Sequence, residues 1–195
     1  MWRDEWNRRY AGSELLWTVK PNRFLVAETD ALPPGRALDL ACGEGRNAVW
    51  LAERGWEVTG VDFAEVGLEK ARGLAAAHGV EAAWVHADLL EYDPPRAAFD
   101  LVVLLYLQLP ADERRRVLTA ASEAVAPGGT LLVVAHDRSN LDDGHGGPQD
   151  PALLATPEEV ARDLDGLEVE RADVVERRNG AVVALDLLVR ARRPW

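Results

Sequence analysis

Short apolar runs alternate with amphipathic stretches along most of the 195-residue chain. The apolar runs predict five strands, at Ala37–Leu40, Glu57–Val61, Ala82–His86, Asp100–Leu105 and Thr130–Ala135. The spacing of apolar positions between them predicts three helices, at Gly45–Arg54, Glu65–His78 and Ala111–Val125. Strands that alternate with helices are typical of a parallel sheet covered on both faces.

The C-terminal third follows a different pattern. Thr156-Pro157-Glu158-Glu159 has the capping residue, the proline and the glutamate that mark the start of a helix. Two further strand-like runs, Leu167–Val175 and Val182–Val189, are joined through Arg178-Asn179-Gly180. Asn-Gly between such runs is a strong signal for a hairpin. We therefore expect an α/β fold with a mostly parallel seven-stranded sheet that ends in an antiparallel hairpin.

Composition narrows the class of protein. The formal net charge of −11 argues against a nucleic-acid partner, because such surfaces are usually basic. No apolar run approaches the roughly 18 residues of a membrane helix, and the first residues lack the apolar stretch of a signal peptide. A single cysteine excludes an internal disulfide framework and a cysteine-based zinc site. We expect one cytoplasmic domain spanning residues 1–195, without a membrane partner.

The most informative segment runs from Ala37 to Asn47, where a strand enters a loop with two glycines and then a helix. Gly43 and Gly45 allow a tight turn and a close approach of the backbone to a ligand. The following helix N-terminus offers free N–H groups to an anionic or polar ligand. Asp62 ends the next predicted strand, where a carboxylate can accept both ribose hydroxyls. Nicotinamide and flavin enzymes share this device, so the glycines alone do not identify the ligand.

Asp39 favours another ligand, because it lies in the strand itself and its carboxylate could face a cationic amino group. With these residues the chain resembles the class I S-adenosylmethionine-dependent methyltransferases, whose signature is Asp-x-x-x-Gly-x-Gly. The segments that match the family are Asp39–Gly45, Val61-Asp62-Phe63, Ala87-Asp88-Leu89, Phe99–Val103 and Pro127-Gly128-Gly129-Thr130. Within that class, the first motif is most similar to the tellurite-resistance and thiopurine methyltransferase group. The resemblance implies a Rossmann-like doubly wound fold.

The resemblance also implies how S-adenosylmethionine, the expected cofactor, is held. Asp39 and the backbone of Gly43 and Gly45 bind its methionyl end, and Asp62 binds its ribose. The other cofactor-binding positions it implies are Phe63 against the adenine, Asp88 at the exocyclic amine, Leu89 beside it, and the main chain near Leu104.

Tyr106 and His136 are the candidate catalytic residues, since each follows a predicted strand at the carboxyl edge of the sheet, where ligands bind in such folds. His136 could act as a base, bind an anion, or merely cap its strand, and Tyr106 could equally be a packing residue. A general base is needed only if the acceptor carries a proton of high pKa. No cluster of carboxylates and histidines has metal-ligand spacing, so we expect no required metal.

The N-terminal segment carries an aromatic stripe of Trp2, Trp6 and Tyr10, spaced for one face of a helix. The helix could simply dock on the core. By resemblance to small-molecule methyltransferases, residues 1–34 could instead form a lid over the core of residues 35–195. Tyr10 and Trp17 would then line the acceptor pocket, with Phe24 helping to close it.

The expected function is therefore in-line transfer of a methyl group from S-adenosylmethionine to a small molecule or a metalloid oxyanion. Two alternatives stay open: an NAD(P)-dependent oxidoreductase, and a protein that binds S-adenosylmethionine without turnover. We expect a monomer or a homodimer.

Overall fold

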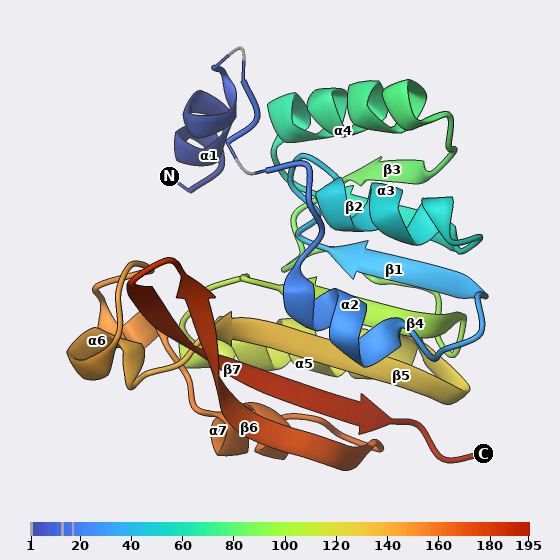
Figure 1. The fold of residues 1–195 in the computed structure, drawn as a ribbon. Helices are drawn as coiled ribbons and strands as arrows, with labels where there is room; N and C mark the ends of the chain where they lie inside the picture. The colour runs from blue at the N-terminus through green and yellow to red at the C-terminus, as the bar shows by residue number, and fades with distance from the viewer. Residues whose placement is uncertain (1, 13, 17) are drawn as a thin grey trace. The chain divides into compact units, whose positions relative to one another are not determined.

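The computed structural model describes residues 2–12, 14–16 and 18–195. In this part of the chain seven strands form one sheet with the order β3-β2-β1-β4-β5-β7-β6, which confirms the predicted Rossmann-like fold class (Figure 1). The strands are β1 (Arg36–Leu40), β2 (Glu57–Asp62), β3 (Ala83–His86), β4 (Phe99–Leu105), β5 (Val125–His136), β6 (Glu168–Asn179) and β7 (Val182–Arg192). The helices are α1 (Trp2–Tyr10), α2 (Arg23–Thr29), α3 (Arg46–Glu53), α4 (Glu65–His78), α5 (Ala111–Ala124), α6 (Asn140–Asp143) and α7 (Pro157–Arg162), with a 3₁₀ turn at Pro151–Leu153.

The chain divides into two compact units, which we describe separately. The first comprises residues 1–93 with 101–103, and the second comprises residues 94–100 and 104–195. None of the helices in the described residues is long and apolar enough to cross a membrane.

The first unit is built on the parallel strands β1, β2 and β3. Leu40 pairs with Val61, and Asp62 pairs with His86, so these strands end at one edge. Apolar residues of β1 and β2 are fully buried, and α3 and α4 pack against the strands and against each other (Figure 1). Burial on both sides of β1 explains why its sequence from Ala37 to Leu40 is apolar apart from Asp39, whereas Arg36 at its start is exposed.

The second unit contains the predicted antiparallel hairpin. β6 and β7 turn through Gly180-Ala181, with Asn179 opposite Val182, and β7 also pairs antiparallel with β5. Helix α5 packs on β5, and α7 packs on β6 and β7. The predicted start of α7 is confirmed, since Thr156 and Glu159 form a capping box.

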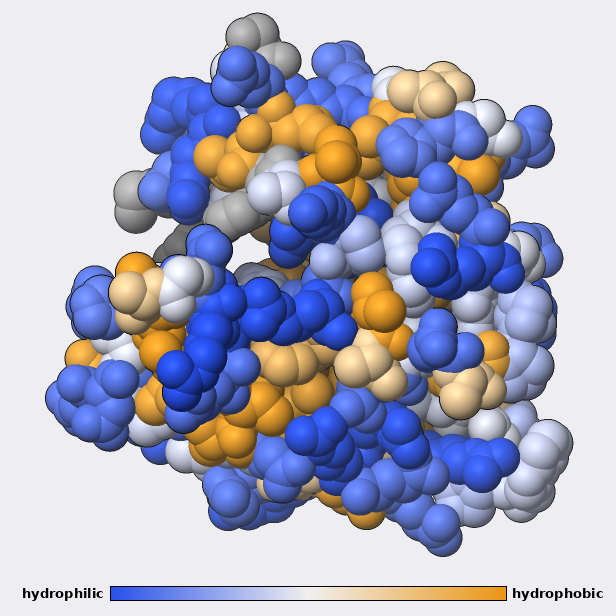
Figure 2. Space-filling model, in the orientation of Figure 1, coloured by the Kyte–Doolittle hydropathy of each residue, from blue (hydrophilic) through white to orange (hydrophobic). Residues whose placement is uncertain are grey.

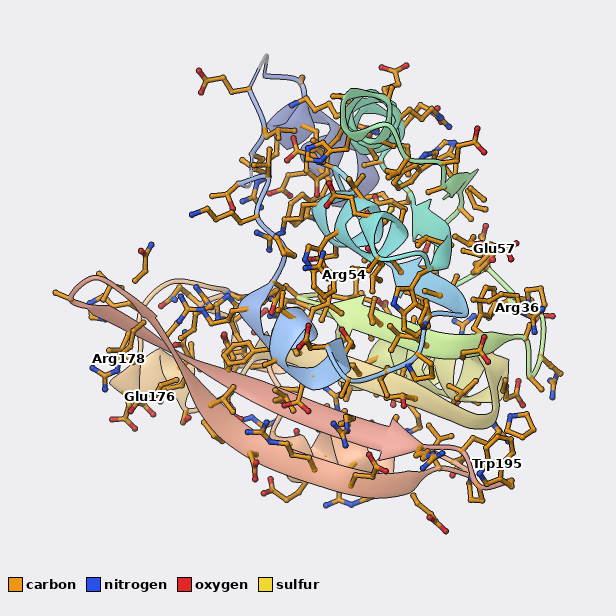
Figure 3. The ribbon with its side chains drawn as sticks, turned by 45° about the vertical axis from the view of Figure 1, so that its right-hand side comes forward. Arg36, Arg54, Glu57, Glu176, Arg178 and Trp195 are labelled. Atoms are coloured by element: carbon orange, nitrogen blue, oxygen red, sulfur yellow. The ribbon has the colours of Figure 1, made fainter. Side chains whose placement is uncertain are left out.

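The ends of the hairpin differ in character. Glu176 and Arg178 form an ion pair at its tip, whereas Trp195 lies at the other end of the unit (Figure 3). Strand β5 begins at Val125 rather than at the predicted Thr130, and within the added stretch the backbone of Gly128 and Gly129 bonds to the backbone of Arg193. On the face shown in Figure 2, hydrophilic residues are widespread and hydrophobic residues gather in smaller patches.

Candidate functional site

The loop between β1 and α3 has the backbone that its two glycines predict. Gly43 and Gly45 have φ angles of 53° and 79°, in the left-handed region that favours glycine. Space is also limiting there: a Cβ on Gly43 would lie 2.7 Å from the hydroxyl of Tyr10, and one on Gly45 would lie 2.7 Å from Cβ of Ala71. Both positions therefore require glycine in this structure, for conformation and for close packing.

Asp62, the last residue of β2, holds this loop in place. Its Oδ2 accepts a hydrogen bond from the backbone N–H of Gly43 and its Oδ1 accepts one from Ala64, both at 2.8 Å. Burial raises the pKa of the carboxyl, and the two backbone hydrogen bonds act in the opposite direction. A carboxylate has about four lone-pair sites, so Asp62 retains capacity to accept further donors.

Asp39 is a buried carboxyl group with one unused oxygen. The residue is 1% exposed, and among the described residues Oδ2 has no hydrogen-bond partner. Burial first, and the charge of Asp62 second, raise its pKa to about 7. A buried oxygen of this kind is costly unless a partner is supplied. The position fits a ligand that brings a cationic amino group.

Cys42 lies between these two carboxyl groups in the chain and is buried. Burial raises the pKa of its thiol well above the usual value, and the charges of Asp39 and Asp62 add to the effect. The thiolate is the reactive form of cysteine, so Cys42 is unsuited to act as a nucleophile here.

The other predicted cofactor residues of the first unit follow β2 and β3. Phe63 is half-buried, and its carbonyl oxygen accepts a hydrogen bond from Nε2 of His86 at 2.9 Å. Nδ1 of the same ring lies 2.8 Å from Oε2 of Glu65. Sequence reasoning placed His86 in a strand but gave it no role, because this bridging contact has no local signal. Asp88 accepts a hydrogen bond from the N–H of Leu90 at 3.0 Å, and Leu89 is buried.

The N-terminal helix lies on the glycine loop. Tyr10 is buried with its hydroxyl against Gly43, and its ring stacks on Trp6 with centroids 5.5 Å apart. Asn7 accepts a hydrogen bond from the N–H of Val66, in the first turn of α4. The predicted lid residue Trp17 and the side chain of Trp2 lie outside the described residues, and Phe24 lies half-buried in α2.

The N-terminal segment contacts the glycine loop and α4 a second time, a few residues after α1. Oε1 of the buried Glu44, in the glycine loop, accepts hydrogen bonds from the N–H of Leu16 and from Nζ of Lys70, both at 3.0 Å. Lys70 also donates to the carbonyl oxygen of Glu14 at 2.7 Å. The segment of residues 14–16 is therefore tied both to the loop and to α4.

In the second unit, three side chains from β6 and from the ends of β4 and β5 converge on Asp186 of β7. Tyr106, just after β4, donates its hydroxyl to Oδ2 at 2.6 Å, and Nε of Arg177 in β6 donates to the same oxygen at 2.7 Å. Nδ1 of His136, at the end of β5, lies 3.2 Å from Oδ1. The structure thus brings Tyr106 and His136 together, with ring centroids 5.3 Å apart.

Sequence reasoning missed Asp186 and Arg177. Asp186 is fully buried, and burial would raise its pKa, but hydrogen bonds from His136, Arg177 and Tyr106 together lower it below the usual value. The signal was present in the chain, since Asp186 is the one charged residue in the apolar run from Ala181 to Val189. A lone carboxylate on a buried strand requires paired donors.

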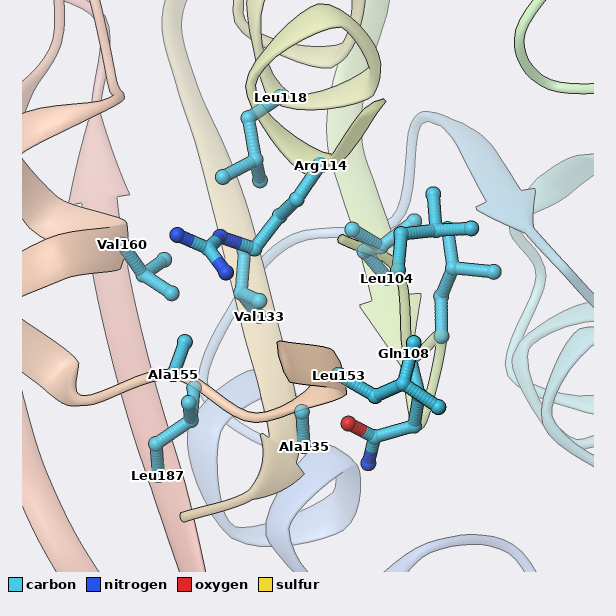
Figure 4. Close-up of a pocket in the computed structure, with 12 residues that line it drawn as sticks. Leu104, Gln108, Arg114, Leu118, Val133, Ala135, Leu153, Ala155, Val160 and Leu187 are labelled. Atoms are coloured by element: carbon cyan, nitrogen blue, oxygen red, sulfur yellow. The ribbon is translucent and has the colours of Figure 1, made fainter. Parts of the chain in front are cut away.

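Leu104 is a buried residue of β4 in the second unit, where its side chain lines the cavity shown in Figure 4. The guanidinium of Arg114 points into this cavity, and its Nη2 lies 3.5 Å from Oδ2 of Asp163. The cavity has about 20 Å³, which is room for a water molecule and not for an acceptor.

Comparison with known proteins agrees with this architecture. Residues 37–129 match the family described as methyltransferase domain. NodS, an N-methyltransferase from Bradyrhizobium japonicum WM9 solved with S-adenosylhomocysteine, has a TM-score of 0.76 at 18% identity, covering 99% of this chain and 98% of that one. The fold is the Rossmann-like fold of the methyltransferases. TehB from Haemophilus influenzae has the same methyltransferase fold, with a TM-score of 0.74 at 18% identity, covering 98% of this chain and 66% of that one.

Sequence identity to curated proteins is higher than to these solved structures, but it covers a smaller part of the chain. A demethylmenaquinone methyltransferase of Thermus thermophilus is 40% identical over 125 residues, which are 63% of this chain and 55% of that protein. The chain spans about half the length of the curated relatives it matches. The segment that matches the methyltransferase domain, residues 37–129, contains the glycine loop, Asp39 and Asp62.

Proposed function

We propose that this protein is an S-adenosylmethionine-dependent methyltransferase that acts on a small-molecule acceptor. The observation that carries the proposal is the unpartnered, buried Oδ2 of Asp39 beside a glycine loop held by Asp62. The amino group of the cofactor supplies a cationic donor to this oxygen. The match of residues 37–129 to a methyltransferase domain supports the same reading.

The residues proposed to hold the cofactor are Asp39, Gly43, Gly45, Asp62, Phe63, Asp88, Leu89 and the main chain near Leu104. The loop backbone and the N-terminus of α3 present N–H groups to its carboxylate. When bound, the cofactor supplies a methyl group on a sulfonium, which is already an activated leaving group. The protein then mainly has to align the acceptor, and proximity and orientation provide most of the acceleration.

The proposed arrangement is a single methyltransferase domain of residues 1–195, in which residues 1–34 form a lid on a core of residues 35–195. Tyr10 against Gly43 and the ties from Glu44 and Lys70 to residues 14–16 support this role. A lid excludes water from the reacting groups and helps to assemble the acceptor pocket.

The acceptor is proposed to be a small molecule, as the name of the demethylmenaquinone methyltransferase says of that relative. The net charge of −11 argues in the same direction, because it disfavours a nucleic-acid acceptor. A metalloid oxyanion, suggested by the resemblance of the first motif, stays an alternative acceptor.

Calorimetric titration with S-adenosylhomocysteine, with NAD and NADP as controls, tests the proposal. We expect micromolar binding of S-adenosylhomocysteine alone. Asp62→Ala should weaken this binding by about 1–3 kcal/mol, because a hydrogen-bond acceptor and the support of Gly43 are both lost. Binding of a nicotinamide cofactor instead would indicate an oxidoreductase, and binding without turnover on any acceptor would favour a non-catalytic protein.

A further inference from the structure

His86, the last residue of β3, joins the end of β2 to the start of α4 within the first unit. Its Nε2 lies 2.9 Å from the carbonyl oxygen of Phe63, and its Nδ1 lies 2.8 Å from Oε2 of Glu65. Asp62, which ends β2, is paired with His86 in the register of the two strands. The imidazole therefore bridges the turn of residues 63–65, which follows the proposed ribose-binding residue and contains the proposed adenine-binding one.

Both atoms that face the ring of His86 are hydrogen-bond acceptors. A carbonyl oxygen and an ionised carboxylate accept hydrogen bonds and cannot donate them. A neutral imidazole carries one ring hydrogen and can satisfy only one of these acceptors, whereas the imidazolium carries two and satisfies both. Histidine changes between these forms in the range of about pH 5 to 8. The contacts in the structure thus correspond to the charged ring.

The turn that His86 bridges depends on neighbouring elements for its bonds. Ala64 is the N-cap residue of α4, and its methyl group cannot cap the helix. The N–H of Ala64 donates to Asp62 of β2, and the N–H of Val66 donates to Asn7 of α1. His86 adds an attachment to β3 on the carbonyl side of the turn. This attachment is complete only while the ring is charged.

The charged and titratable groups at His86 come from β2, from α4 and from the loop after β3. Oε1 of Glu65 lies 3.4 Å from Nη1 of Arg72, and Asp88, two residues after His86, accepts a hydrogen bond within its own loop. Burial raises the pKa of the Asp62 carboxyl, and the charge of His86 is one of the effects that lower it. The side chains of His86 and Glu65 are 44% and 46% exposed, so solvent weakens their attraction. A modest effect on binding is therefore expected.

We propose that His86 is a positioning residue for the nucleoside part of the cofactor and that it acts in its charged form. This inference rests on the proposed binding of S-adenosylmethionine. The imidazolium fixes the turn of residues 63–65, which places Phe63 against the adenine and supports Asp62 at the ribose. When the ring loses its charge, it releases either Phe63 or Glu65, and the turn loosens. The contribution of His86 to nucleoside affinity is therefore lost as the pH rises from 6 to 8.

5′-Methylthioadenosine is the probe that isolates the nucleoside end. It keeps the adenine, the ribose and a thioether sulfur, but it lacks the amino and carboxyl groups of S-adenosylhomocysteine. Its binding therefore does not include the proposed pairing of an amino group with Asp39, whose carboxyl has a pKa of about 7. The pH dependence that Asp39 gives to the complete ligand is thus separated from that of His86.

His86→Gln keeps one donor for the Phe63 carbonyl but cannot gain or lose a charge. In calorimetry, the wild type should bind 5′-methylthioadenosine about threefold more tightly than the variant at pH 6, and equally at pH 8. Asp62 titrates in both proteins, so its effect cancels from this ratio of affinities. A ratio that is the same at both pH values would show a merely structural contact and would overturn the proposal.

A matched control lies at the other end of α4. His78 and Glu53 are the last residues of α4 and α3, and Nδ1 of His78 lies 2.8 Å from Oε1 of Glu53. Their exposure, 36% and 38%, is similar to that of the pair at His86. We expect His78→Gln to bind the probe as the wild type does at both pH values. The same pH-dependent ratio in this variant would mean that charge in general is responsible, and the proposal would fail.

Glu65→Gln tests the bridge from its other side. An amide can donate to Nδ1 of a neutral ring, so both contacts of His86 persist without a charge. Its affinity relative to His86→Gln should therefore be independent of pH, and the double variant should show no further pH-dependent loss. A pH-dependent difference that remains after Glu65→Gln would contradict the bridge.

Binding of S-adenosylhomocysteine is measured on each protein before the probe. Its absence in the wild type would overturn the proposed function, and with it this inference. Binding of S-adenosylhomocysteine together with a pH-independent ratio for 5′-methylthioadenosine would overturn the role of His86 alone.

Discussion

At the scale of single residues, Asp39 links protonation to both stability and ligand binding. Its carboxyl has a pKa of about 7 in the folded chain, far above the value of an exposed aspartate, because it is buried beside Asp62. Between roughly pH 4 and pH 7, the folded state therefore binds more protons at this residue than the unfolded state does. The contribution of Asp39 to stability must fall as the pH rises through this window.

Asp39→Asn should remove this pH dependence. We expect the free energy of unfolding of the variant above pH 7 to be higher than that of the wild type by up to about 4 kcal/mol, because no buried charge forms. Denaturant unfolding at a series of pH values measures the effect. In calorimetry, the wild-type affinity for S-adenosylhomocysteine should increase by up to about tenfold for each unit by which the pH is raised toward 7. The affinity of the variant should be weaker and should not change with pH. A parallel pH dependence in both proteins would refute the pairing with an amino group.

At the scale of elements, the N-terminal segment is attached to the first unit by few but specific contacts. Tyr10 packs on Gly43, and the segment 14–16 is tied through Glu44 and Lys70. Lys70 is mostly buried and donates to two partners, so its removal leaves Glu44 without its cationic neighbour. Hydrogen bonds to charged groups contribute more than neutral ones, and this lysine is therefore the element's most sensitive attachment.

Lys70→Met should release the N-terminal segment. We expect faster trypsin cleavage near Arg8 and Arg9, and about tenfold weaker binding of S-adenosylhomocysteine, since hydrogen bonds to charged groups are worth about 1.5–3 kcal/mol. The exposed Lys20 provides the control, because Lys20→Met removes the same charge without removing a donor to Glu44 or to residue 14. Similar behaviour of the two variants would mean that net charge, and not the attachment, is responsible.

The elements themselves could be predicted well because their signals are local. The interior of each strand and the capping box of α7 follow from periodicity and from side chains a few residues apart. The inclusion of Gly128 and Gly129 in β5 could not be predicted, because their backbone bonds to Arg193, which is distant in the sequence. The same reason hides Asp186 and Arg177, because the members of their cluster come from four strands that are far apart in the sequence.

At the scale of the whole molecule, the excess of acidic over basic residues disfavours negatively charged partners. The formal net charge is −11, and arginines such as Arg115, Arg138 and Arg177 are paired with carboxylates in the structure. A polyanion would be repelled at long range, with a strength that grows as salt is removed. Charge is thus a property that the sequence alone predicts, whereas the pairing of individual charges requires the folded chain.

Nucleic acid should not bind even at low ionic strength. Fluorescence anisotropy with a labelled duplex DNA and a structured RNA measures this, and we expect no change for either. The control is the same titration with a basic protein of similar size. Affinity that falls steeply with added salt would identify a nucleic-acid acceptor and replace the small-molecule proposal.

The position of Cys42 makes its thiol a probe of how often the glycine loop opens. Cys42 is the sole cysteine of the sequence, its sulfur lies beside Gly60, and burial together with the charges of Asp39 and Asp62 raises the pKa of its thiol. A thiol reagent can reach it only while the loop stands open, so the rate of labelling counts the openings. Any ligand that binds to the loop should lower the rate at which Cys42 is labelled. A compound that binds can therefore be recognised from the lower labelling rate before any reaction is known.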